Sequence, residues 1–304
     1  KDNRIEEEVG IITSDGKEHL WESKSLQRLG KVDMAVITFT SKKKYKVAII
    51  GDSKKVKYQD QVYVAGFPLF DVGNLKVESG EVVANAEISI DQGYQLLYTN
   101  QTEKGMSGGV ILNKNGELIG LHGRGEIDRK KKKEEEVIRK TGINLGVPIS
   151  FYKQFLNGLT VEVSKKNSTT ADDYLAQAIA SHAKKGREQT IFRLINKALK
   201  LKEDYPSAYF IRGYAYSDLG DKNRAIADYS KAIESYPRYV DAYNNRGILK
   251  HNLKDYYGAI DDLSKAIEIN PRNAKAYNNR GGAKYALKNY YGAIADYSKA
   301  IEIN

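Results

Sequence analysis

The sequence predicts two structural classes in one chain, a β-barrel followed by an all-α solenoid of repeats. Over about the first 150 residues, short runs rich in Val, Ile, Tyr and Phe alternate with turn residues. From about residue 172 the pattern becomes helical and repeats every 34 residues. We therefore expect a β domain over 1–157, a polar linker over 158–171 and a repeat domain over 172–304.

Composition narrows the classes of function. The chain has no cysteine, which excludes disulfides, thiolate metal sites and a cysteine nucleophile. No apolar run reaches the roughly 18 residues of a membrane span. The net charge is +10, but the dense basic run 129–133 is followed directly by Glu134–Glu136. We interpret that run as a solvated loop or helix face rather than a nucleic-acid site. No cofactor or metal is implied, and the compartment is left unassigned.

The β pattern consists of many short strands without helices between them, which predicts a barrel or a sandwich. Asp15-Gly16 and Asn115-Gly116 mark tight turns. Expected strands cover 32–39, 45–50, 61–65, 80–90, 94–98, 110–112, 118–122 and 143–147, and a short helix covers 151–156.

Tyrosine, glycine, alanine and proline carry the 34-residue period of the second half. Gly213, Gly247 and Gly281 share this interval, as do Pro237 and Pro271. Such a period resembles the tetratricopeptide repeat, in which each unit is two antiparallel helices that pack closely at small residues. We expect a divergent first unit at 172–205, full units at 206–239 and 240–273, and a nearly complete unit at 274–304.

Ser107 lies in the segment Gly105-Met106-Ser107-Gly108-Gly109, followed at once by a strand pattern. Glycines beside a serine let backbone N–H groups converge on one point. An acyl-transfer nucleophile needs this arrangement, because the hydroxyl must sit on a sharp turn beside donors that hold an oxyanion.

This serine turn, together with the strand Val32-Asp33-Met34-Ala35-Val36-Ile37, resembles chymotrypsin-like serine proteases over residues 9–157. The resemblance implies that Ser107 is the nucleophile, that Asp33 orients a histidine, and that the Gly105 and Ser107 amides form the oxyanion hole. The histidine belongs upstream of Asp33. His19 follows a turn and lacks the usual small-residue run, so we interpret it as a surface strand residue.

We therefore expect the catalytic histidine to be encoded before Lys1, and we expect a companion N-terminal fragment or a longer chain to complete the first barrel. The combination of a compact protease with appended repeats suggests a bacterial origin by association alone. Met106 stands where chymotrypsin has an aspartate that pairs with a new N-terminus, so that activation switch is not expected.

Thr102 and His122 lie five residues before and fifteen after the serine, spacings that resemble the glutamyl endopeptidase branch. There a threonine and an easily protonated histidine contact an acidic side chain. Gln101, at the pocket position of trypsin's aspartate, disfavours cleavage after Lys or Arg. Alternatively, His122 is an ordinary strand histidine and Thr102 a loop residue. Residues Gly123, Arg124 and Gly125 are expected to pair with the substrate backbone.

The first helices of the repeats are expected to line a groove that binds a peptide or protein through amide side chains. The alternative is a rigid spacer or oligomerisation arm. The groove asparagines are Asn244, Asn245, Asn278 and Asn279. For the whole chain, the leading hypothesis is a serine endopeptidase whose repeats recruit protein substrates or regulators. The main alternative is a catalytically inactive adaptor.

Overall fold

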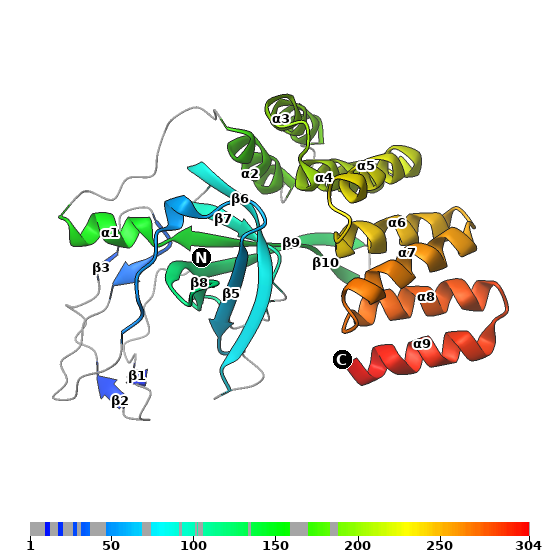
Figure 1. Ribbon diagram of the computed structural model, residues 1–304, viewed down its shortest axis with the longest axis horizontal. Helices are drawn as coiled ribbons and strands as arrows, with labels where there is room; N and C mark the ends of the chain where they lie inside the picture. Colours follow the sequence, from blue (N-terminus) through cyan, green and yellow to red (C-terminus); the bar gives the residue numbers. More distant parts are fainter. Residues whose placement is uncertain are drawn as a thin grey trace. The chain divides into compact units, whose positions relative to one another are not determined.

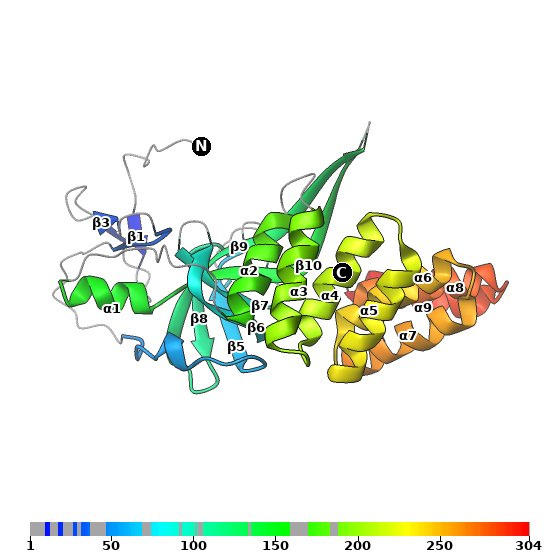
Figure 2. The ribbon, with the colours of Figure 1, turned by 90° about the horizontal axis from the view of Figure 1, so that it is seen from above.

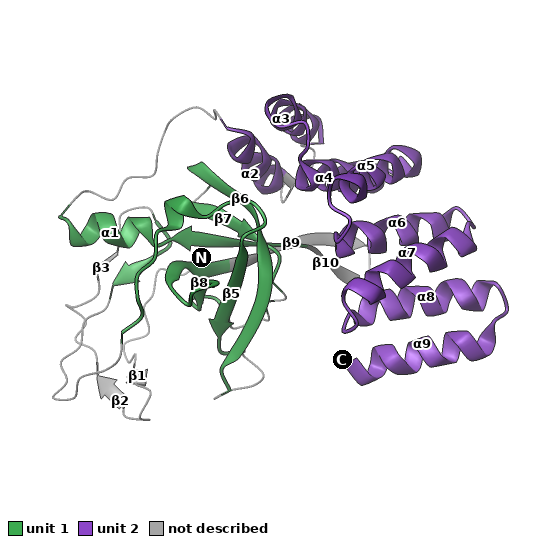
Figure 3. Ribbon diagram, viewed as in Figure 1, with its two compact units in different colours: residues 1–168 green, residues 169–304 purple. Residues whose placement is uncertain are grey.

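The computed structural model divides the chain into two compact units, residues 1–168 and 169–304 (Figure 3). It describes residues 10–12, 18–20, 27–28, 32–36, 47–68, 74–90, 93–100, 102, 106–132, 135–158, 170–182 and 188–303. For 10–12, 18–20, 27–28, 124–132, 135–141 and 182 this covers the backbone alone. The division between the units falls within the polar segment 158–171.

Antiparallel strands of the first unit close into a barrel in the order β10-β7-β6-β5-β8-β9 (Figure 1). The strands are β5 (Gln61–Gly66), β6 (Lys76–Ile90), β7 (Tyr94–Tyr98), β8 (Val110–Asn113), β9 (Leu118–Lys132) and β10 (Glu135–Pro148). Alternation directs every second side chain inward, as Val62 and Val64 of β5 illustrate with 1% and 0% exposure. The barrel core consists of Val62, Val64, Val82, Leu96, Tyr98, Met106, Ile111 and Ile119.

Shorter elements accompany the barrel. Strand β1 (Gly10–Ile12) pairs with β2 (Glu18–Leu20), and β3 (Gln27–Arg28) pairs with β4 (Ala35–Val36), each pair antiparallel. A 3-10 turn covers Ser53–Lys55, and helix α1 (Ser150–Leu156) follows β10 where the short helix was expected.

Several details of the first unit differ from the expectations. In the expected strand 32–39, residues 32–34 are irregular, only Ala35–Val36 forms a strand, and 37–39 lie outside the described residues. Residues 47–49 are irregular, because the chain meets β9 only around the isolated bridge between Ile50 and Leu118. Strand β6 starts at Lys76, earlier than expected, because it pairs with β5 as far as Gly66. The described residues of the charged run, 129–132 and 135–136, lie in the paired strands β9 and β10, so the expected loop or helix face is wrong for them.

Helical hairpins follow one another along the second unit (Figure 2). Each expected repeat corresponds to one hairpin, which confirms a β-barrel followed by an α solenoid. The helices are α2 (Ala171–His182), α3 (Glu188–Leu201), α4 (Pro206–Asp218), α5 (Lys222–Ser235), α6 (Val240–Asn252), α7 (Tyr256–Ile269), α8 (Ala274–Ala286) and α9 (Tyr290–Ile303).

The periodic glycines lie where the two helices of a hairpin approach most closely. A Cβ at Gly247 would lie 2.9 Å from Leu263 Cγ, and one at Gly281 would lie 2.8 Å from Tyr297 Cε1. Both distances are below normal contact, so any side chain there would separate the helices. The period of the sequence therefore marks the packing contacts of the solenoid.

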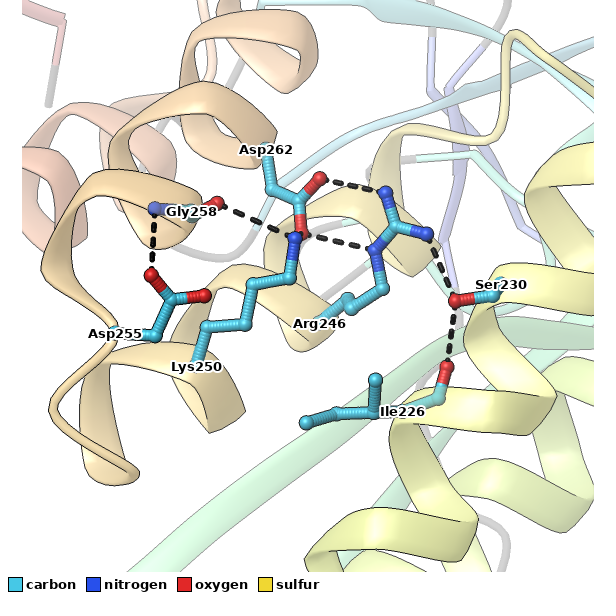
Figure 4. Close-up of polar contacts among 7 residues, drawn as sticks. All are labelled: Ile226, Ser230, Arg246, Lys250, Asp255, Gly258 and Asp262. Atoms are coloured by element: carbon cyan, nitrogen blue, oxygen red, sulfur yellow. Dashed lines mark hydrogen bonds and ion pairs between the residues drawn. The ribbon is translucent and has the colours of Figure 1, made fainter.

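Buried ion pairs repeat with the same 34-residue period. Arg246 donates two parallel hydrogen bonds to the Asp262 carboxylate, at 2.9 and 2.6 Å, and a third at 2.9 Å to Ser230 Oγ of the preceding hairpin (Figure 4). Lys250 also lies 2.9 Å from Asp262. Each arginine of this set therefore joins three helices. The equivalent pairs are Arg212–Asp228 and Arg280–Asp296.

Candidate active site

The turn before β8 presents Ser107 to solvent. Met106 is fully buried in the barrel core, whereas Ser107 and Gly108 are exposed. Gly108 has φ +89°, a left-handed conformation that favours glycine. A Cβ at Gly109 would lie 2.4 Å from the Ala65 carbonyl oxygen, so the turn presses against β5. The local sequence thus anchors one side of the serine and leaves the residue exposed to solvent.

Hydrogen bonds fix the turn to β9. The Gly108 N–H donates to the His122 carbonyl, and the His122 N–H donates to the Gly109 carbonyl, both at 2.7 Å. Within the described part of the chain, the Ser107 N–H has no hydrogen-bond partner. That amide is available to an oxyanion. Gly105, the other expected donor, lies outside the described residues.

Asp33 precedes β4 and its side chain is exposed, while its neighbours Val32 and Met34 are buried at 6% and 7% exposure. The Tyr94 hydroxyl donates a hydrogen bond to Asp33 Oδ2. Tyr94 also packs against the backbone of Gly123, the residue after His122. Two contacts therefore connect the carboxylate of Asp33 to the strand that holds the serine turn.

His122 is buried, with 2% of its surface exposed, and its Nδ1 lies 2.6 Å from the Tyr98 hydroxyl. Burial lowers the pKa of His122 from 6.5 to about 4, so the imidazole is neutral at pH 7. The expectation of an easily protonated ring is therefore wrong. Burial also raises the pKa of Tyr98, which stays protonated and can donate to Nδ1. That arrangement places the imidazole proton on Nε2.

Thr102 forms part of a polar cluster that the sequence did not reveal. Its hydroxyl donates to Asn144 Oδ1 at 2.8 Å, and the Asn144 amide donates to the Asn100 carbonyl at 2.6 Å. Asn100 and Asn144 are buried, with 4% and 5% exposure. The sequence did contain one indication of this cluster. Asn144 lies inside the apolar run 143–147, and a buried amide needs hydrogen-bond partners.

The segment Gly123–Gly125 belongs to β9. Strand β10 pairs with it on one side, through Leu145 opposite Arg124 and Asn144 opposite Gly125. On the other side, the described pairing with β8 ends at Leu121. The backbone of these residues therefore leaves one edge of β9 without a described strand partner, as the expected substrate pairing requires.

The upstream histidine, His19, lies in β2 opposite Ile11. Its side chain is outside the described residues, as is Gln101. Among the described residues we find no cluster of ligands able to hold a metal ion, and none of their helices is long and apolar enough to cross a membrane.

The groove asparagines are less available than expected. Asn244 is 8% exposed and accepts a hydrogen bond at 3.1 Å from the Asn279 amide. Asn245 is half-buried and hydrogen-bonds the Tyr229 hydroxyl, whereas Asn278 is exposed. Asn244 thus helps to join neighbouring hairpins, because the close packing of α6 and α8 leaves its amide little solvent contact.

Comparisons with known proteins divide the chain in the same way. A family model for the trypsin-like peptidase domain matches residues 1–121. Tetratricopeptide repeat models match residues 240–273, and residues 206–239 and 274–304. No curated protein gives a significant match.

Solved structures of MamA are among those similar to this chain. "Crystal structure of MamA" is 24% identical, covers 51% of this chain and 85% of its own, and has a TM-score of 0.42. "MamA 41-end from Desulfovibrio magneticus RS-1" is 22% identical, covers 44% and 75%, and has a TM-score of 0.41.

Proposed function

The chain joins a trypsin-like peptidase domain to tetratricopeptide repeats, and from this premise we propose that it is a serine endopeptidase whose repeats recruit proteins. The observation that carries the proposal is the exposed Ser107 turn, which is connected through Tyr94 and Gly123 to the Asp33 carboxylate. The Ser107 amide has no hydrogen-bond partner among the described residues. Ser107 attacks the peptide carbonyl, and the main-chain N–H donors stabilise the resulting oxyanion.

The general base is the remaining requirement. His122 does not fill this role, because it is buried and its Nδ1 is bound to Tyr98 rather than Asp33. Asp33 Oδ1 has no hydrogen-bond partner in the described part of the chain. We propose that an imidazole outside the described residues binds there and takes the proton of Ser107.

A fluorophosphonate probe tests the proposal directly, because it modifies only an activated serine. We expect covalent labelling of Ser107 in the full-length protein, loss of labelling in Ser107→Ala, and unchanged labelling in Ser235→Ala, which changes a half-buried serine of the second unit. Wild-type protein that stays unmodified by mass spectrometry contradicts the endopeptidase and favours the inactive adaptor. That alternative draws on one observation, that no described histidine contacts Asp33.

We propose that residues beside the serine bind an acidic side chain of the substrate through neutral donors. His122 supplies an Nε2–H that can donate to a carboxylate without a positive charge. The Thr102 hydroxyl donates to Asn144 Oδ1, so it becomes a donor to the substrate only when that hydrogen bond is exchanged. A bound carboxylate raises the pKa of the imidazole, and the preference for Glu over Gln therefore increases as the pH falls. A peptide panel varied at the residue before the cleaved bond checks this, and a preference for Arg contradicts it.

The repeat surface is proposed to hold a protein substrate or regulator. Asn278 is exposed, and Asn245 and Asn279 are half-buried. Two-site binding raises the local concentration of a substrate at Ser107. Cross-linking through a photoreactive residue at position 278, with position 231 on an exposed part of α5 as the control, identifies partners of this face. Equal cross-linking at both positions contradicts a specific groove.

A further inference from the structure

Tyr94 stands at the first position of β7 and is almost fully buried, with 1% of its surface exposed. Its hydroxyl nevertheless reaches the exposed carboxylate of Asp33 and donates a hydrogen bond to Oδ2. The tyrosine therefore extends from the barrel wall to one oxygen of the proposed catalytic aspartate. The strand pattern of the sequence alone gave this residue no role.

Two glycines make room for this contact. A Cβ at Gly123 would lie 2.0 Å from Tyr94 Cε1 and 2.7 Å from its hydroxyl oxygen, so only glycine allows the ring to lie on β9. Gly93 has φ +90°, and a Cβ there would lie 2.7 Å from Val32 Cγ1. The side chain of Val32, which precedes Asp33, therefore packs on Gly93 just before β7. The segment that carries Asp33 contacts this part of the chain through Val32 as well as through its carboxylate.

We propose that Tyr94 is a positioning residue, whose hydroxyl fixes the Asp33 carboxylate so that its second oxygen faces the general base. An aspartate in this chemistry holds an imidazole in one tautomer and stabilises its charged form, which requires a fixed orientation. A neutral phenol donor provides orientation without cancelling the negative charge. The inference rests on the proposed endopeptidase function.

Tyr94→Phe removes the hydroxyl and keeps the ring against Gly123. We expect the maximal rate of fluorophosphonate labelling at Ser107 to fall about 10-fold to 100-fold, the loss typical of a hydrogen bond to a charged group. The probe concentration at half-maximal rate stays unchanged, because Tyr94 does not touch the probe. Tyr63→Phe, a half-buried tyrosine of β5, is the matched control and keeps the wild-type rate.

A double-mutant cycle separates positioning from a purely structural role. If Tyr94 acts through Asp33, Tyr94→Phe has no further effect on the labelling rate of an Asp33→Ala protein. Effects that multiply in the double variant overturn the proposal, as does an undiminished rate in Tyr94→Phe. Equal thermal midpoints of Tyr94→Phe and Tyr63→Phe show that both fold. A wild-type protein that does not react overturns the endopeptidase itself, an outcome distinct from these.

Discussion

Replacing Arg212 and Asp228 by alanine and leucine gives the second hairpin the residues that stand at the equivalent positions of the first, Ala178 and Leu194. Those two are buried at 0% and 4% exposure and make no ion pair. The side chains of Arg212 and Asp228 are 21% and 8% exposed and lie 2.7 Å apart. The chain thus contains both solutions, an ion pair and an apolar pair, at one structural position.

The two single substitutions should be costly and the double substitution mild. Arg212→Ala leaves a buried carboxylate without a cation, which costs about 3 kcal/mol. Asp228→Leu costs about 2 kcal/mol, because Arg212 keeps some solvent contact and its hydrogen bond to Asn196. The double variant removes both charges and loses about 1 to 2 kcal/mol, which leaves a coupling energy of about 3 to 4 kcal/mol.

Urea unfolding of the full chain, followed by helical circular dichroism, measures these values. The matched control is Lys231→Ala with Glu234→Ala, an ion pair three residues apart within α5. Its side chains are 61% and 65% exposed. That exposed pair should couple by less than about 0.5 kcal/mol. Additive effects of Arg212→Ala and Asp228→Leu would refute the assignment of a buried, coupled pair.

Three further outcomes follow from individual residues. The pKa of His122 is about 4 in the folded barrel and near 6.5 in the unfolded chain. The free energy of unfolding therefore falls by about 3 kcal/mol as the pH is lowered from 6.5 to 4. His122→Asn should flatten this pH dependence in urea titrations. Lys254 has φ +66° where Gly220 of the preceding hairpin has φ +82°, so Lys254→Gly should stabilise by about 1 kcal/mol and Gly220→Lys should destabilise, as thermal unfolding checks. Ile260 packs against the core of α7 and α8, whereas the equivalent Ile294 is 61% exposed; Ile260→Lys should cost about 2 kcal/mol and Ile294→Lys less than about 0.5 kcal/mol in urea unfolding.

The fold was largely predictable because its signals are local and periodic. Alternating apolar residues placed β7 at Tyr94–Tyr98, with the same bounds in the structure. The spacing of Gly213, Gly247 and Gly281 placed the hairpins, because close helix packing admits no side chain there. These features depend on neighbours in sequence or on a repeat, so they are visible without coordinates.

The ion pairs and the surroundings of the site were not predictable in the same way. Asp228 lies in a helix with several other charged residues, and the sequence does not distinguish the buried charge of that helix from the solvated ones. The contact between Tyr94 and Asp33 joins residues far apart in the chain. The pKa of His122 depends on burial, which strand alternation near the serine turn did not specify. The catalytic roles of Ser107 and Asp33 stay predictions.

Each arginine of the periodic set also bonds the hairpin before its own. Arg212 donates to Asn196, Arg246 to Ser230 and Arg280 to Ser264, at 2.9 to 3.0 Å. When one hairpin unfolds, the arginine of the next hairpin therefore loses a hydrogen-bond acceptor. Unfolding of one hairpin thus destabilises its neighbour. Cooperativity in a linear solenoid comes from such interfaces. We expect the hairpins to unfold together in a single transition rather than to fray one by one.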